Sequence, residues 1–516
     1  MTKIRGIRKF CFLFFIFGIL PGCNSNSNSE ISAPDSSSNS VVKNFAESLN
    51  PQLASQLAGS TIQPAGNWQI QYWMLDSGGN SYPVPIAVGN TQGPTIIDIA
   101  NFGAVCDGVT PDTAAFQSAA KFAGSWYQAS KLPTTINIST GKEGVCVIDS
   151  TVYVPSGTHF VGAGGVVQAV GSMGAVFESD GGSNIGYDQM QITASTANVN
   201  VGIYYITSSA NTNGPYQNFS LTNSVIHGAA YAVIVNVYEY PDGLSRKLTN
   251  VNISNNTVFC DLINGGFDTK CRDGIHISGE VADVEITSNL VKQRNDAAYA
   301  LTSDGTPDLE TSIATFGSLL PGLTPTNVTI SNNIGTDDQT CLDFSGGNNV
   351  VANNNQCVDT IPISGSGPSM RFVFGGYLPL PSNITVNGGT FSNVIGPEAV
   401  DPSNVKMSFD SFAVNGQYPV CNCSISNVTL GGYIYMLGNT FAFNNVTFNQ
   451  SASFVVATEN EDTTNAITVS NSNWGSPRTI SPTNINGGIS NSYLINDTYN
   501  GKTTAKKAIQ FPWVEN

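Results

Sequence analysis

A nine-residue pattern of apolar and polar positions recurs along the chain between residues 218 and 474. The second and fourth positions are apolar and their neighbours are polar, as with Val251 and Ile253 in the copy Asn250–Val258. This period of two predicts a β-strand with one buried face. The copies begin at Asn218, Asn250, Asp283, Asn327, Asn349, Asn383, Asn422, Thr440 and Ala466.

The sixth position of the pattern is asparagine in most copies. The residues concerned are Asn223, Asn255, Asn332, Asn354, Asn427, Asn445 and Asn471. Asparagine tolerates the left-handed backbone of a tight turn, and its amide can hydrogen-bond toward a neighbouring coil. No regular helical half separates the copies, which excludes ankyrin and leucine-rich repeats, and a β-sandwich would not align asparagines in one column. The pattern therefore predicts an all-β chain folded as a parallel β-helix, with coils about 4.8 Å apart.

The segment before the first copies predicts a cap for one end of this β-helix. Residues 95–122 read TIIDIANFGAVCDGVTPDTAAFQSAAKF. Thr110 suits a helix N-cap, Pro111 the first helical position and Asp112 the first turn, and an apolar face follows. Such a helix would cover core and strand edges that an open coil exposes. Asp107 and Asp112 are interpreted as turn and cap residues.

This head segment resembles the opening of the pectate-lyase-like superfamily, which includes polygalacturonases, rhamnogalacturonases and related epimerases. Cys106 and Pro111 stand where the family pattern has Gly and Asp. The resemblance implies a single-stranded, right-handed parallel β-helix over residues 96–516 with an N-terminal capping helix. It is specific for the fold and says little about chemistry, because one fold hosts many functions.

The N-terminus predicts export. A basic stretch, Lys3–Lys9, is followed by the apolar run Phe10–Leu20, which suits a signal peptide and is too short to span a bilayer. The sequence Leu-Pro-Gly-Cys that ends at Cys23 resembles the lipobox of bacterial lipoproteins. That resemblance implies a signal peptide over 1–22, lipidation of Cys23 and a membrane anchor at the outer membrane or cell surface. An ordinary cleaved signal remains the alternative. We expect a flexible tether over 23–45 and an N-terminal extension over 46–95.

The composition of the chain limits the kinds of partner that it is expected to bind. The formal net charge is −16, which argues against nucleic acid because phosphate binding needs clustered Lys and Arg. In an exported protein, cysteines form disulfides, and no His lies at metal-ligand spacing from them, so no metal site is predicted. Cys421 and Cys423 are only two positions apart, which is close for a bridge. The predicted pairs are Cys106–Cys146, Cys260–Cys271 and Cys341–Cys357.

Residues 270–302, KCRDGIHISGEVADVEITSNLVKQRNDAAYALT, carry the candidate chemistry. They resemble the polygalacturonase motifs NTDGxxI and DDCIAI, which implies catalytic roles for Asp273 and Asp296. Asn295 replaces the first Asp of the second motif, and the later GHG and RIK motifs of that family are absent.

The positions of the acidic residues relative to the predicted strands also indicate a site in this part of the chain. Asp273, Asp296 and the pair Asp337–Asp338 each precede a predicted strand, so three neighbouring coils present carboxylates at one end of a sheet, roughly 5 to 10 Å apart. Glycoside hydrolysis needs two carboxyl groups at about that separation, and crowding raises the pKa of one of them. His276 follows Asp273 and is a candidate proton shuttle. The alternative interpretation, that these acids cap turns and pair with nearby arginines, remains open.

Cationic and aromatic residues surround the acids. The candidate substrate-binding residues are Lys270, Arg272, Lys292, Arg294 and Tyr299, with Tyr231 as a second ring that could stack on sugars. The leading prediction is an exported glycoside hydrolase that acts, without a cofactor, on a pectin-like or other uronic-acid polysaccharide. One alternative is a polysaccharide lyase with calcium and Arg272 or Arg294 as base. Another is a non-catalytic glycan-binding or adhesive lipoprotein.

Overall fold

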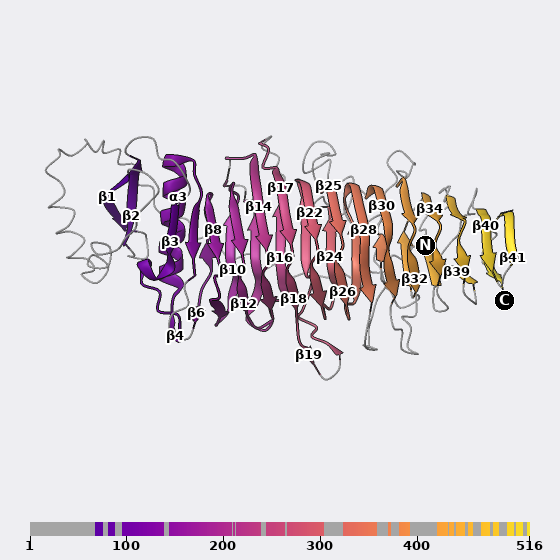
Figure 1. The fold of residues 1–516 in the computed structure, drawn as a ribbon, viewed down its shortest axis with the longest axis horizontal. Coiled ribbons are helices and arrows are strands. Elements are labelled where there is room, and N and C mark those ends of the chain that lie inside the picture. Colours follow the sequence, from indigo (N-terminus) through magenta and orange to yellow (C-terminus); the bar gives the residue numbers. More distant parts are fainter. Residues whose placement is uncertain are drawn as a thin grey trace, which may run out of the picture.

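The computed structural model is a right-handed parallel β-helix, seen in Figure 1 as a long stack of strands with the N-terminal elements at one end. It describes residues 68–75, 81–87 and most of 95–515. The longer segments outside this description are 139–143, 239–243, 304–323, 359–369, 373–380, 393–420, 458–465 and 484–492.

One sheet of twelve strands runs along the whole stack. In spatial order from the N-terminal end, its strands are β7 (Val152–Tyr153), β10 (Met173–Asp180), β13 (Val199–Ile206), β16 (Tyr231–Val237), β21 (Ile275–Gly279), β24 (Ala297–Thr302), β27 (Thr340–Ser345), β29 (Met370–Phe372), β33 (Tyr433–Leu437), β36 (Ser453–Ala457), β39 (Arg478–Thr483) and β42 (Trp513–Glu515). We call it the twelve-stranded sheet.

The remaining long sheet has two bands of strands joined by tight turns. Its members are β3 (Thr95–Asp98), β4 (Asp107–Pro111), β5 (Thr134–Asn137), β6 (Val145–Ile148), β8 (Thr158–Val161), β9 (Val166–Ala169), β11 (Ile185–Asp188), β12 (Gln191–Thr193), β14 (Tyr216–Thr222), β15 (Val225–His227), β17 (Leu248–Ser254), β18 (Thr257–Phe259), β22 (Val281–Thr287), β23 (Leu290–Lys292), β25 (Thr326–Ser331), β26 (Ile334–Thr336), β28 (Asn348–Val358), β30 (Ser382–Ser392), β31 (Cys423–Ser426), β32 (Thr429–Gly431), β34 (Thr440–Asn444), β35 (Thr447–Phe448), β37 (Ala466–Ser470), β38 (Asn473–Trp474), β40 (Tyr493–Tyr499) and β41 (Lys502–Ala508).

A typical coil takes one strand from the twelve-stranded sheet and then a strand from each band, as in β21, β22 and β23. Neighbouring coils pair in parallel and in register. The last pairs, β39–β42 and β40–β41, are antiparallel, so the chain folds back on itself at the C-terminal end. That reversal supplies partners for strand edges that the final coil would otherwise expose.

The predicted apolar positions form the core. Val251, Ile253, Val284 and Ile286 are at most 1% exposed, and equivalent residues of successive coils pair across the sheet. The period-two pattern is therefore confirmed, because every second side chain of a strand points into the coil.

The asparagine positions are confirmed as turns but only partly as the predicted ladder. All the sixth-position asparagines have left-handed backbones, with Asn255 at φ 58°. The buried ladder lies one position later: the Nδ2 atom of Asn256 donates to Oδ1 of Asn289 at 2.9 Å, and Asn289 donates likewise to Asn333 at 3.0 Å. The residue after the left-handed turn points into the coil, so its amide replaces hydrogen bonds that buried backbone groups need.

The capping helix is confirmed, and its predicted start is wrong. Helix α3 (Thr113–Ser130) buries one apolar face, and its Phe116 ring lies 5.8 Å from that of Phe160 in the core. Thr110 and Pro111 belong to β4 instead, because β4 pairs with β6 of the next coil. The Asp112 carboxylate turns back and accepts a hydrogen bond from the Val105 N–H at 2.7 Å.

Two further elements precede the first coil. The short 3-10 helix η1 (Ile99–Phe102) packs against α3, and the hairpin of β1 (Trp68–Leu75) and β2 (Ser81–Ala87) lies beside α3 at the same end (Figure 1). This hairpin falls within the predicted extension 46–95. The predicted signal peptide, the lipidation of Cys23 and the tether lie outside the described residues. Among the residues that the structure describes, no helix is long and apolar enough to cross a membrane.

The three predicted disulfides are present: Cys106–Cys146, Cys260–Cys271 and Cys341–Cys357. The structure also joins Cys421 and Cys423, a pair that the close spacing did not predict. A small antiparallel pair, β19 (Leu262–Ile263) and β20 (Gly266–Phe267), lies in the loop closed by the second disulfide.

Candidate active site

Polar side chains gather on the outward face of the twelve-stranded sheet, over β21, β24, β27 and β29. Because the strands pair in register, one row across the sheet reads His276, Ala300, Asp343 and Arg371. Equivalent residues on adjacent strands lie about 4.8 Å apart, so this row brings a base, an acid and a cation from three coils together. Asp273 and Asp296 come just before β21 and β24 and complete the group, which we call the acidic cluster.

Asp273 and His276 form a hydrogen-bonded pair within the cluster. The Oδ2 atom of Asp273 lies 2.6 Å from Nδ1 of His276, and its Oδ1 accepts the Ala297 N–H at 2.9 Å. On the other side of the ring, Nε2 of His276 lies 2.9 Å from the Thr302 hydroxyl. Both ring nitrogens thus have oxygen partners, an arrangement that suits the imidazolium form.

The pKa values of this pair are displaced in opposite directions. Burial opposes ionisation of Asp273, but the hydrogen bond and charge of His276, together with the Ala297 N–H and the Arg294 charge, outweigh it and lower the Asp273 pKa. Burial also opposes charging of His276, but its hydrogen bond to Asp273 and the charges of Asp273, Asp343 and Asp296 outweigh that effect and raise the His276 pKa. The two groups therefore favour the carboxylate and imidazolium forms together.

Asp296 is the most accessible carboxyl group of the cluster, with 37% of its side chain exposed, against 8% for Asp273 and 5% for Asp343. Its pKa is raised to about 6, first by burial and then by the charge of Asp273, while Arg371 opposes the shift. Neighbouring carboxylates that cannot all ionise together produce such a difference between chemically identical groups.

Asp343 and Arg371 form the third part of the cluster. The Arg371 guanidinium pairs with the Asp343 carboxylate, and its Nη2 atom lies 3.9 Å from Oδ1 of Asp296. Asp343 raises the pKa of Arg371, so the arginine stays cationic. One guanidinium nitrogen thus lies beside two carboxylates, those of Asp343 and Asp296.

The sequence predictions missed Arg371 and did not include Asp343 among the catalytic residues. Asp343 alternates outward in Thr340–Ser345 and could have been found from that alternation. Arg371 lies in the three-residue strand β29, outside any copy of the repeat pattern, so no signal marked its register.

Predicted substrate-binding residues divide into those near the cluster and those away from it. Arg272 is exposed and interacts electrostatically with Asp296, and the Tyr231 ring lies 6.4 Å from that of His276. Lys270 is exposed on the preceding loop. Lys292 lies on β23, which belongs to the other long sheet, so it does not face the cluster.

Arg294 and Tyr299 are enclosed, which contradicts their prediction as substrate ligands. Both are at most 1% exposed, and the Tyr299 hydroxyl donates to the backbone carbonyl of Ile334 at 3.0 Å. Asp337 and Asp338 are also buried, and the carboxylate of Asp338 accepts the Arg294 N–H at 2.9 Å. Both acids are enclosed and do not join the cluster, and Asp338 supports the backbone of Arg294.

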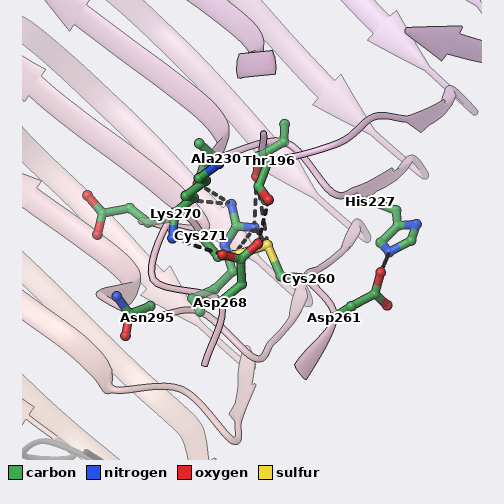
Figure 2. The surroundings of a disulfide bond; sticks show 12 residues. Thr196, His227, Ala230, Cys260, Asp261, Asp268, Lys270, Cys271 and Asn295 are labelled. Atoms are coloured by element: carbon green, nitrogen blue, oxygen red, sulfur yellow. Dashed lines mark hydrogen bonds and ion pairs between the residues drawn. A yellow bond between two sulfur atoms is a disulfide. The ribbon is translucent and has the colours of Figure 1, made fainter. Parts of the chain in front are cut away.

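Arg294 holds the loop that carries Asp273. Its Nη2 donates to the Asp273 carbonyl at 2.6 Å, and its Nη1 lies 2.7 and 3.0 Å from the sulfurs of Cys260 and Cys271. Burial lowers the Arg294 pKa to about 10, well above neutrality. Figure 2 shows this disulfide with Ala230 beside it, whose carbonyl accepts another Arg294 hydrogen bond at 3.3 Å. Arg294 is therefore a structural residue beneath the cluster.

Comparison with known proteins finds similar solved structures but no matching family. No protein-family model matches the chain, and no curated protein matches its sequence. The catalytic unit of a GH87 α-1,3-glucanase from Streptomyces thermodiastaticus is 15% identical, with 84% of this chain and 73% of that chain covered and a TM-score of 0.48. The polygalacturonase of Erwinia carotovora is 12% identical, with 78% and 98% covered and a TM-score of 0.44. An N-terminal fragment of bacteriophage phi29 gene product 12 is 15% identical, with 80% and 73% covered and a TM-score of 0.44.

Proposed function

We propose that the chain is a polysaccharide-acting enzyme that hydrolyses glycosidic bonds at the acidic cluster. The observation that carries the proposal is the accessible Asp296 carboxyl, whose pKa of about 6 leaves it largely protonated in mildly acidic solution beside groups that favour their charged forms. A general acid needs that combination of access and a pKa near the working pH. The proposal rests on this chemistry, because the fold alone hosts many functions.

Asp296 acts as the general acid and Asp273 as the base. Asp296 gives its proton to the glycosidic oxygen as the bond to the anomeric carbon breaks. Asp273, which favours its ionised form beside His276, accepts a proton from the water that forms the new bond to that carbon. One proton leaves the cluster and one enters it, so a later exchange with solvent restores both groups. Asp343 orients Arg371 next to the acid.

The cations favour an acidic sugar as substrate. Arg371 is 28% exposed at its side chain and lies beside Asp296, and Arg272 is exposed on the same side. Arginine binds planar carboxylates with two parallel hydrogen bonds, so these two residues suit a uronic-acid unit next to the scissile bond.

A product assay tests the proposal against lyase and binding alternatives. The full chain is incubated with polygalacturonate, alginate and α-1,3-glucan, and products are identified by mass spectrometry. Hydrolysis adds water to each new end, whereas a lyase leaves an unsaturated sugar that absorbs ultraviolet light. Products with added water, lost in Asp296→Asn and retained in the exposed control Glu285→Gln, are expected.

Either of two other outcomes of this assay would contradict the proposal. Unsaturated products that depend on calcium would identify a lyase, with Arg272 as its base, since the enclosed Arg294 cannot reach a polymer. Binding of a polymer without any product would identify a glycan-binding module.

A further inference from the structure

A second site lies at the N-terminal end of the same molecule, away from the acidic cluster. A pocket of about 730 Å³ opens between helix α3 and the first strands of the twelve-stranded sheet. Small-molecule sites in proteins have about 300–1,000 Å³, so the pocket has room for a ligand. Its lining includes Tyr127, Tyr153, Tyr216, Glu178, Lys121 and Lys131.

Strand register separates the pocket from the cluster. Glu178 on β10 pairs in register with Tyr204 on β13, Tyr204 with Ile234 on β16, and Ile234 with His276 on β21. Three strand spacings of about 4.8 Å therefore separate Glu178 from His276, roughly 14 Å along the stack. None of the acidic-cluster residues lines the pocket.

The walls of the pocket are preformed. The side-chain amide of Gln117 on α3 donates to the Tyr153 carbonyl and accepts the Tyr153 N–H, both at 2.9 Å, which fixes the helix to the sheet edge. The Tyr127 hydroxyl accepts a hydrogen bond from Asn184 at 2.7 Å. Gly181 has a left-handed backbone, and a Cβ there would lie 2.7 Å from the Tyr216 ring, so the floor admits no side chain. A site that is ordered before binding loses less conformational entropy when it is occupied.

The side chains offer an aromatic face and a carboxylate together. Tyr153 is 57% exposed. On the adjacent strand, burial first and the charge of Asp180 second raise the pKa of Glu178. Within the described part of the chain, no hydrogen-bond donor occupies the Glu178 carboxylate, whereas Asp180 accepts the Ser208 N–H at 2.6 Å. Glu178 is thus the carboxyl group of this pocket that is available to a ligand.

We propose that this pocket binds a neutral saccharide unit of a glycan, independently of catalysis at the acidic cluster. The apolar face of a sugar ring stacks on the exposed Tyr153 ring, and sugar hydroxyls donate to the Glu178 carboxylate in charge-assisted hydrogen bonds. The pocket is lined by Lys121 and Lys131 on the helix side and by acidic residues on the sheet side. Because the lining carries both signs of charge, a neutral ligand fits it better than a polyanion or a cation.

Calorimetric titration tests this site in the full chain. The background variant carries Asp296→Asn and Arg371→Ala, which prevents turnover and weakens binding at the cluster. The probes are cellohexaose, xylohexaose and an α-1,3-linked glucose hexamer, with hexagalacturonate as the acidic comparison. We expect at least one neutral hexamer to bind, and Tyr153→Ala and Glu178→Gln each to raise its Kd about tenfold. Glu285→Gln, an exposed acid on β22 of the other sheet, is the matched control and leaves the Kd unchanged.

Three results of this titration would overturn the proposal. If no neutral hexamer binds, or if both pocket variants keep the background Kd, the pocket is not a saccharide site. A preference for hexagalacturonate that is lost in Tyr153→Ala would assign the pocket to acidic sugars and overturn the stated ligand class. Because the background lacks the proposed acid, these outcomes do not depend on whether the wild type hydrolyses any polymer.

Discussion

Replacing Arg294 with Met tests whether the acidic cluster rests on a buried cation. Arg294 is fully buried, and its guanidinium donates to the carbonyls of Ala229, Ala230 and Asp273 at 3.2, 3.3 and 2.6 Å. Methionine has a similar volume and no donor, so Arg294→Met leaves these carbonyls without their partner. Because methionine is neutral, the substitution introduces no unpaired buried charge at position 294.

The expected loss of stability follows from those contacts. A buried polar group that loses its partner costs about 1 to 3 kcal/mol, and water can reach some of the freed carbonyls after relaxation. Because three carbonyls lose their partner and water can compensate for part of that loss, we expect the free energy of unfolding to fall by about 3 to 5 kcal/mol. That is a large part of the 5 to 15 kcal/mol that typically stabilises a domain.

Urea titration followed by circular dichroism measures this difference. Lys292→Met, two residues away on an outward position of β23, is the matched control and is expected to change the free energy of unfolding by less than about 0.5 kcal/mol. The Asp273 pKa is also expected to rise in Arg294→Met, because the arginine charge lowers it. If Arg294→Met were no less stable than Lys292→Met, the structural role assigned to Arg294 would be wrong.

Three further predictions concern neighbouring features. Replacing both Cys260 and Cys271 with Ala removes a crosslink over 11 residues and should lower the free energy of unfolding by about 2 to 4 kcal/mol in urea titration; an unchanged value would show that Arg294 alone holds the loop. Asn289→Leu interrupts the buried ladder and should cost about 2 to 4 kcal/mol by the same measurement, whereas a neutral effect would mean that the ladder is dispensable. Since the folded-state pKa of Asp296 is raised from 3.8 to about 6, the folded state binds this proton more tightly, and stability declines as pH rises across that window; the decline should be smaller in Asp296→Asn, and equal profiles would contradict the raised pKa.

Much of the fold could be predicted because the β-helix repeats. Val251 and Ile253 mark a buried strand face, and Asn255 marks the turn that follows, so local rules and global architecture agree. The position of the buried amide ladder was harder to predict. The recurrence of Asn256 and Asn289 after the turn was visible in the sequence, but only the coil geometry shows that these side chains point inward.

The site was less predictable because it depends on register between distant segments. Asp273, His276 and Asp296 lie within one stretch of the chain, and their proximity follows from one coil of separation. Arg371 reaches them through the pairing of β27 with β29, which no local pattern reveals. Arg294 was predicted to be a surface cation, because the sequence alone does not show whether a charged side chain is buried.

The rate of reducing-end formation across about pH 4 to 9 tests the central claim, that Asp296 is the acid of a glycoside hydrolase. With a polymer that the wild type cleaves, we expect the rate to fall as pH rises through about 6, as the Asp296 carboxyl loses its proton. Asp296→Asn should reduce the rate at least about 100-fold, since general acid catalysis contributes factors of that size. A wild-type rate in Asp296→Asn, with the same dependence on pH, would contradict the account.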